Sequence, residues 1–113
     1  MNERRIDRVC QLLLGRMNLV SLWTAHGPSD QAIQYLEEGS PLSSGEHLML
    51  LVCFDLFNDT GKATIGRILN VFDESHVRAL ADFMRVIRVS DPRALDGWIA
   101  GEEALQERRG VAR

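Results

Sequence analysis

The sequence predicts an all-α fold, a compact single-domain bundle of about six helices spanning residues 1–113 around a central apolar helix at 44–58. Three observations predict this fold. Apolar residues recur at helical spacing along most of the chain, capping residues precede the apolar segments, and turn residues separate them. A chain of 113 residues has room for one domain with a substantial core.

The first helix is expected over residues 3–24. Gly15 weakens the middle of this helix, because glycine is a poor helix former, and residues 26–28 (His-Gly-Pro) end it. The apolar side chains that recur at helical spacing are Ile6, Val9, Cys10, Leu13, Met17, Val20 and Trp23.

A second, short helix is expected after Ser29, whose hydroxyl can accept a hydrogen bond from the exposed backbone N–H groups of a first turn. Gly39 is placed to end it, because glycine adopts a positive φ without a steric penalty. Pro41 then marks a turn before the central helix.

The central helix begins with a capping box. Ser43 can accept from the backbone N–H of Glu46 while the Glu46 carboxylate reaches back. The run that follows, residues 48–54, is apolar on all sides, a pattern that fits either a buried strand or a buried helix. The capping box and the apolar continuation to Phe57 favour a helix over 44–58.

Three further N-cap residues predict three more helices. They are Thr64, Asp73 and Asp91, the last directly before a proline, which favours the first helical position. The expected ranges are 65–72, 74–89 and 92–108, the last interrupted by Gly97 and Gly101 and followed by a frayed tail at 110–113.

Composition narrows the class of protein. Apolar residues make up 45% and charged residues 26% of the chain, which is typical of a folded globular protein and argues against disorder. The net charge of −3 disfavours nucleic acid as a partner. Twelve of the thirteen basic residues are arginines, which suggests a GC-rich bacterial or phage coding sequence.

The chain carries no signal-peptide pattern, and its longest apolar run falls far short of the ~20 residues that a membrane span needs. Cys10 and Cys53 both lie in apolar helical patterns, where a thiol acts as a small hydrophobe of raised pKa and low reactivity. We therefore expect a soluble, cytoplasmic protein with no membrane contact.

Local motifs give no reaction, metal or cofactor. Asp55, Asn58 and Asp59 precede Gly61, but neither a calcium loop nor a phosphate-binding loop fits the spacing. The favoured interpretation is a polar helix end with Gly61 in a left-handed turn.

The three histidines are too far apart in sequence for a zinc site, and His47 and His76 are interpreted as solvated residues of first helical turns. We therefore assign no catalytic, metal-binding or cofactor-binding residue, and expect no cofactor. The sequence carries no motif that indicates a particular family.

Residues 64–89 have the helix, turn, helix shape of many DNA readers. Against DNA binding, Asp82 is spaced to neutralise two of the segment's arginines, and Asp73 and Glu74 stand at the end that would approach phosphates. The basic residues of this alternative are Arg67, Arg78, Arg85 and Arg88.

A candidate partner-binding patch lies in the last helix. Trp98 stands between Gly97 and Gly101, and tryptophan is enriched in interface hot spots. Leu95 and Ile99 extend the apolar patch. Internal packing is the competing interpretation of the same three side chains.

The leading hypothesis is a non-enzymatic protein–protein interaction module, such as a small adaptor, inhibitor or regulatory subunit. Its partner would be another protein, a second copy of the chain, or both. The alternative is a DNA-binding regulator that uses residues 64–89, and an enzyme ranks third. Fold class does not choose among them, since helical bundles host unrelated functions.

Overall fold

The computed structural model describes residues 3–88 and 91–109. Within them lie six α-helices and one two-stranded hairpin, which confirms the predicted all-α fold. The helices are α1 (Glu3–Gly15), α2 (Asp30–Glu38), α3 (Ser44–Asn58), α4 (Ile65–Val71), α5 (Glu74–Ile87) and α6 (Pro92–Arg108), and the strands are β1 (Trp23–Thr24) and β2 (Gly27–Pro28).

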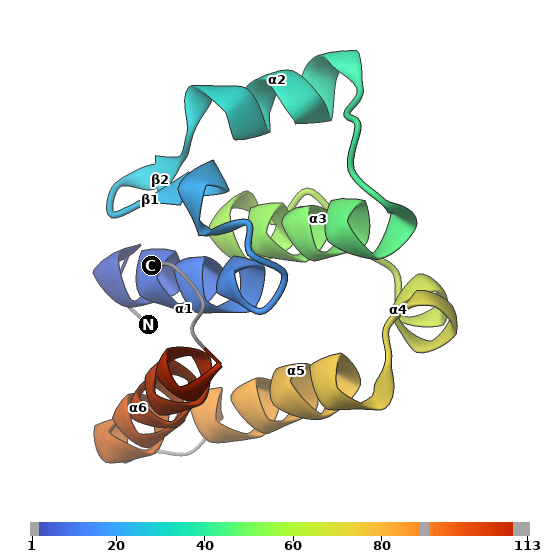
Figure 1. The fold of residues 1–113 in the computed structure, drawn as a ribbon. Coiled ribbons are helices and arrows are strands. Elements are labelled where there is room, and N and C mark those ends of the chain that lie inside the picture. The colour runs from blue at the N-terminus through green and yellow to red at the C-terminus, as the bar shows by residue number, and fades with distance from the viewer. Residues whose placement is uncertain (1–2, 89–90, 110–113) are drawn as a thin grey trace.

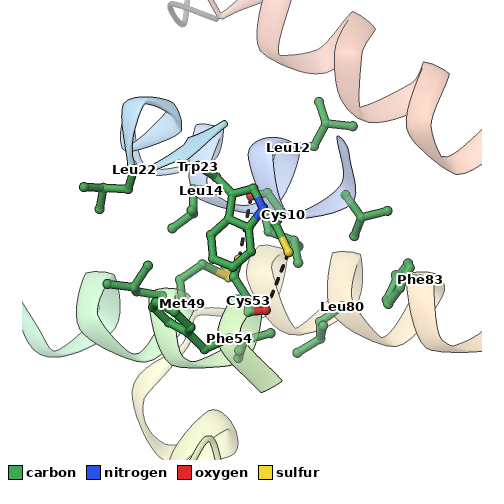
Figure 2. Close-up of a cluster of buried hydrophobic side chains, with 14 of the residues drawn as sticks. Cys10, Leu12, Leu14, Leu22, Trp23, Met49, Cys53, Phe54, Leu80 and Phe83 are labelled. Atoms are coloured by element: carbon green, nitrogen blue, oxygen red, sulfur yellow. Dashed lines mark hydrogen bonds between the residues drawn. The ribbon is translucent and has the colours of Figure 1, made fainter. Parts of the chain in front are cut away.

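Helix α3 forms the centre of the molecule, as the apolar run predicted. It lies beside α1, with α2 on one side of this pair and α5 and α6 on the other (Figure 1). Every side chain from residue 48 to 54 is buried, so α3 contributes to the core around its whole circumference (Figure 2). The Cα radius of gyration, 13.3 Å, matches the ~13 Å expected of a compact domain of this length.

The predicted caps form. Ser43 and Glu46 make both hydrogen bonds of the capping box, and the helix they start spans the predicted residues 44–58. The side chains of Ser29, Thr64, Asp73 and Asp91 each accept a hydrogen bond from a backbone N–H in the first turn that follows. Gly39 ends α2 with a φ of 91°.

The helix predicted over 3–24 is wrong in its second half, since α1 ends at Gly15. At this point α6 crosses closely: a Cβ built on Gly15 would lie 2.3 Å from the Gln106 side-chain oxygen. The Gln106 amide donates at 2.6 Å to the Leu12 carbonyl, which also accepts from the Arg16 backbone N–H. The chain then reverses through Asn18, which has a positive φ of 60°.

Beyond Gly15 the predicted stripe breaks up: Val20 begins a short 3-10 helix, Val20–Leu22, and Trp23 begins a hairpin. Strands β1 and β2 pair antiparallel, and Trp23 packs edge-on against Phe54 and Phe57. The Trp23 indole N–H donates to the buried Asp7 carboxylate at 2.9 Å. Gly27 has a φ of 122° and lies against the Phe57 ring, so only glycine suits this turn.

Helix α5 ends at Ile87, two residues before the predicted end. Residue 89 and the tail 110–113, for which fraying was predicted, lie outside the described residues. No helix in the described part of the chain is both long and apolar enough to cross a membrane.

Candidate functional site

The polar end of α3 has a structural role, as the favoured interpretation held. The Asp55 carboxylate accepts from the Thr60 hydroxyl and from the backbone N–H groups of Lys62 and Ala63. Burial alone would raise the pKa of Asp55, but these bonds and one from the Gly61 backbone together lower it. With Gly61 at a φ of 72°, Asp55 organises the loop that leads into α4.

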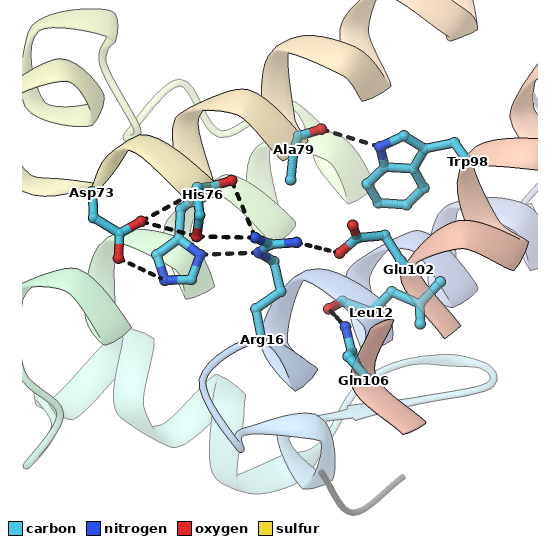
Figure 3. A network of polar contacts seen from close by, with 9 residues as sticks. Leu12, Arg16, Asp73, His76, Ala79, Trp98, Glu102 and Gln106 are labelled. Atoms are coloured by element: carbon cyan, nitrogen blue, oxygen red, sulfur yellow. Dashed lines mark hydrogen bonds and ion pairs between the residues drawn. The ribbon is translucent and has the colours of Figure 1, made fainter. Parts of the chain in front are cut away.

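Internal packing explains the candidate patch of α6. Leu95 is buried and Trp98 is only 9% exposed, while Ile99 is partly buried. The Trp98 ring packs against Phe83 with 5.3 Å between centroids. Its indole N–H donates to the Ala79 carbonyl at 3.1 Å (Figure 3). The burial of Leu95 and Trp98 agrees with internal packing, the competing interpretation, and Trp98 joins α6 to α5.

The two glycines beside Trp98 face away from this contact. A Cβ built on Gly97 or on Gly101 would meet no atom within 4 Å. Neither glycine therefore permits a close approach of helices within the described chain.

The four arginines of the DNA-binding alternative, Arg67, Arg78, Arg85 and Arg88, are all exposed. Two of them are partly neutralised. Arg85 pairs with Asp82 at 3.9 Å as predicted, whereas Arg78 pairs with Glu74 at 2.8 Å rather than with Asp82. These carboxylates lie among the arginines along α5, which weakens the surface as a phosphate-binding face.

A buried cation joins three helices, and the sequence reasoning missed it. The Arg16 side chain, only 4% exposed, follows the end of α1 and reaches α5 and α6 (Figure 3). It donates to His76 Nδ1 at 2.9 Å, to the Ser75 carbonyl at 3.1 Å and to the Glu102 carboxylate. The sequence does contain a sign that Arg16 is buried: it lies three residues after Leu13 and so falls on the apolar stripe of the predicted helix.

His76 is part of this network, not the solvated residue that the sequence suggested. Arginine can only donate, so the Nδ1 atom that accepts from Arg16 must be unprotonated. Burial lowers the pKa of His76 below 6.5, and the cations Arg16 and Arg109 lower it further, although the carboxylates of Asp73 and Glu102 oppose them. The geometry therefore selects a neutral imidazole that is already engaged in a structural contact.

We expect the free energy of unfolding to fall as the pH drops below about 6.5, the ordinary histidine pKa. Because the pKa of His76 is lower in the folded than in the unfolded state, the unfolded chain binds the proton first. The loss continues until the pH passes the lowered folded value, with a slope of at most about 1.4 kcal/mol per pH unit for one proton. Urea unfolding at several pH values between neutral and about 5 measures this slope. The lower limit stays above the pKa range of ordinary carboxyl groups.

The variant His76→Gln is the matched test of this assignment, since its amide oxygen can still accept from Arg16 but does not titrate. In His76→Gln the free energy of unfolding should change less with pH over this range. The control His26→Gln, which removes an exposed imidazole, should keep the wild-type pH dependence. An unchanged slope in His76→Gln would assign the effect to another group.

The two cysteines are free, fully buried and held in the core. Each thiol lies 3.7 Å from the backbone carbonyl of the other cysteine (Figure 2). Burial, reinforced by the neighbouring Cys10, raises the pKa of the Cys53 thiol and keeps it protonated. Both thiols are therefore packing groups.

An open pocket of about 560 Å³ lies where the end of α1 meets the starts of α3 and α5. Its carboxylates, Glu46 and Asp73, are already hydrogen-bonded as helix-capping groups. Its histidine is His76, which Arg16 holds. In the residues that the structure describes, no three His, Cys, Asp or Glu side chains are grouped to hold a metal ion.

Helix α4 carries the most exposed large apolar side chains of the described chain. Ile65 is 75% and Leu69 is 64% exposed, and the two lie one turn apart. Figure 1 shows α4 at the edge of the molecule. Ile68 contacts the core from that side, so Ile65 and Leu69 are left to solvent.

The cations around α4 lack partners. Lys62 and Arg67 make no ion pair with any described residue, as is also true of Arg88, Arg108 and Arg109. We call Ile65 and Leu69 the α4 ridge; Arg67, two residues from each, lies on the other side of the helix. On one flank, Arg67 borders an open cavity of about 290 Å³, whose other lining residues are Ser40, Leu42, Ser44 and His47.

The sequence could not single out this ridge. Helix α4 has four large apolar residues among seven, and a short helix packed on one side cannot bury them all.

Comparison with protein-family models, curated proteins and solved structures found no match. The function is therefore inferred from the geometry of the chain itself.

Proposed function

We propose that the chain is a non-enzymatic protein–protein interaction module whose contact surface is the α4 ridge. The single observation that carries this proposal is the exposure of Ile65 and Leu69 on one side of α4. Leaving two large aliphatic side chains in water forgoes the burial free energy of about 1.5–3 kcal/mol that each could contribute. A partner that covers the ridge recovers that free energy.

The arrangement of charge supports the same proposal. Exposed Lys62 precedes the helix and exposed Arg67 lies on its other flank, so charged side chains border the apolar pair, as the polar rim of a protein interface does. The groups most suited to chemistry are engaged elsewhere: His76 accepts from Arg16, and both thiols are buried. The DNA-binding alternative is not pursued, because two of its four arginines pair with carboxylates on α5.

We expect Ile65→Ser combined with Leu69→Ser to abolish partner binding without unfolding the protein. Because both side chains are exposed, the change in free energy of unfolding should stay within about 0.5 kcal/mol. The measurement is affinity capture of tagged protein from cells of the native host, with quantitative mass spectrometry of everything retained, untagged copies of the chain included.

The matched control is Met84→Ser, which removes an apolar side chain 53% exposed on α5, away from the ridge. A protein retained by the wild type and by Met84→Ser, but lost from the double variant, supports the proposal. If every retained protein remains bound to the double variant, the α4 ridge is not the contact surface.

A further inference from the structure

His76 lies between the buried Arg16 network and the open pocket of about 560 Å³ (Figure 3). Its Nδ1 atom accepts from Arg16 at 2.9 Å, and its Nε2 atom lies 3.7 Å from the Asp73 carboxylate. The Phe72 ring packs edge-on against the imidazole, with 6.0 Å between centroids. One imidazole thus contacts a buried cation, a carboxylate and the residue that directly follows α4.

The contact with Arg16 exists only while the imidazole is neutral. A second proton on the ring occupies the Nδ1 lone pair that accepts from Arg16 and brings two cations into contact. Arg16 cannot withdraw without losing its bonds to the Glu102 carboxylate and to the Ser75 carbonyl. His76 has room to turn, because its ring lines the open pocket.

The pocket beside the ring is suited to a cation. The residues that line it include two carboxylates, Glu46 and Asp73, and neither lysine nor arginine. Glu46 Oε1 accepts from the Ser43 backbone N–H, and Asp73 Oδ1 accepts from the His76 backbone N–H. Each carboxylate has a second oxygen, and an imidazolium is a strong donor to such an atom.

The other charged groups around His76 oppose one another. Arg16 after α1 and Arg109 after α6 disfavour an imidazolium at the neutral position, whereas Asp73 before α5 and Glu102 on α6 favour it. Helix α3 contributes Glu46 on the pocket side. The repulsive contact at hydrogen-bond distance is with Arg16.

We propose that His76 is a proton-driven switch with two positions: the neutral ring accepts from Arg16, and the protonated ring turns into the pocket toward Glu46 and Asp73. Turning breaks a bond between the end of α1 and α5, and it withdraws the imidazole from Phe72, which ends α4. The switch goes beyond the proposed interaction function. Only its consequence for a partner rests on that function, because α4 carries the ridge.

NMR spectroscopy of the full chain, titrated downward from neutral pH, tests the movement. The His76 ring signals are assigned by their absence from the spectrum of His76→Gln. At neutral pH we expect a nuclear Overhauser effect between the His76 and Phe72 rings, since the two are in contact. This effect should disappear as the imidazole titrates, while the far-UV circular dichroism spectrum remains helical.

The variant Glu46→Gln tests where the protonated ring goes. Glutamine also serves as the third helical residue of a capping box, so α3 should form as in the wild type. Losing a carboxylate that receives the imidazolium should lower the pKa of His76, with a loss in proton affinity of about tenfold, the low end for a close opposite charge. The control Glu38→Gln removes an exposed carboxylate of α2 and should leave the pKa of His76 unchanged.

Three results would overturn the switch. A contact with Phe72 that persists through the titration means that the ring stays in place. A pKa of His76 that is the same in Glu46→Gln as in the wild type means that the pocket does not receive the charge. Unfolding before the imidazole titrates means that no folded, protonated state exists. Because none of these measurements needs a partner, each leaves the test of the α4 ridge unaffected.

Discussion

Replacing Arg16 with methionine is expected to lower the free energy of unfolding by about 3–5 kcal/mol, a large share of the total stability of a small domain. The guanidinium is almost fully buried and bridges α1, α5 and α6 through Ser75, His76 and Glu102. Without it the mostly buried Glu102 carboxylate loses its ion-pair partner, and an unpaired buried charge is among the costliest defects. Urea unfolding at neutral pH measures the loss.

The double variant Arg16→Met with Glu102→Leu separates the stranded charge from the lost packing. Replacing both partners of a buried ion pair with apolar residues is often neutral or stabilising, so the double variant should regain most of the lost stability. If the single variant costs less than about 1 kcal/mol, the range of an exposed pair, the network contributes little in solution.

Replacing Trp98 with alanine is expected to cost about 3–5 kcal/mol, because it empties the contact between α5 and α6. The indole packs against Phe83 and donates to the Ala79 carbonyl, so truncation leaves a cavity and removes this hydrogen bond between the helices. Thermal or urea unfolding detects the change. The variant Trp98→Phe keeps most of the ring packing and should cost less, mainly the hydrogen bond, at about 1–2 kcal/mol.

The Trp98→Ala variant also distinguishes internal packing of this tryptophan from a role in a protein interface. An unchanged melting temperature together with a lower oligomer mass would restore the interface that the sequence suggested. The burial of Trp98 and Leu95 leads us to expect unfolding instead.

The sequence determined the fold class, five of the six helices to within about two residues at each end, and the caps that start them. These features are local: an N-cap such as Ser43 or Asp73 acts within one turn, and apolar spacing marks a helix wherever the chain lies. The polar end of α3 is equally local, since the Asp55 carboxylate accepts from backbone N–H groups of the loop that directly follows it.

Only the tertiary structure decided where α1 ends, which way Trp98 faces and what surrounds Arg16. Each depends on a neighbour distant in sequence: Gln106 lies against Gly15, Ala79 receives the indole N–H, and His76 accepts from Arg16. The α4 ridge is decided in the same way, because helical spacing shows that Ile65 and Leu69 share a side but not whether another helix covers it. Burial is a property of the packed molecule, and the periodicity of one segment carries no information about the segment that packs against it.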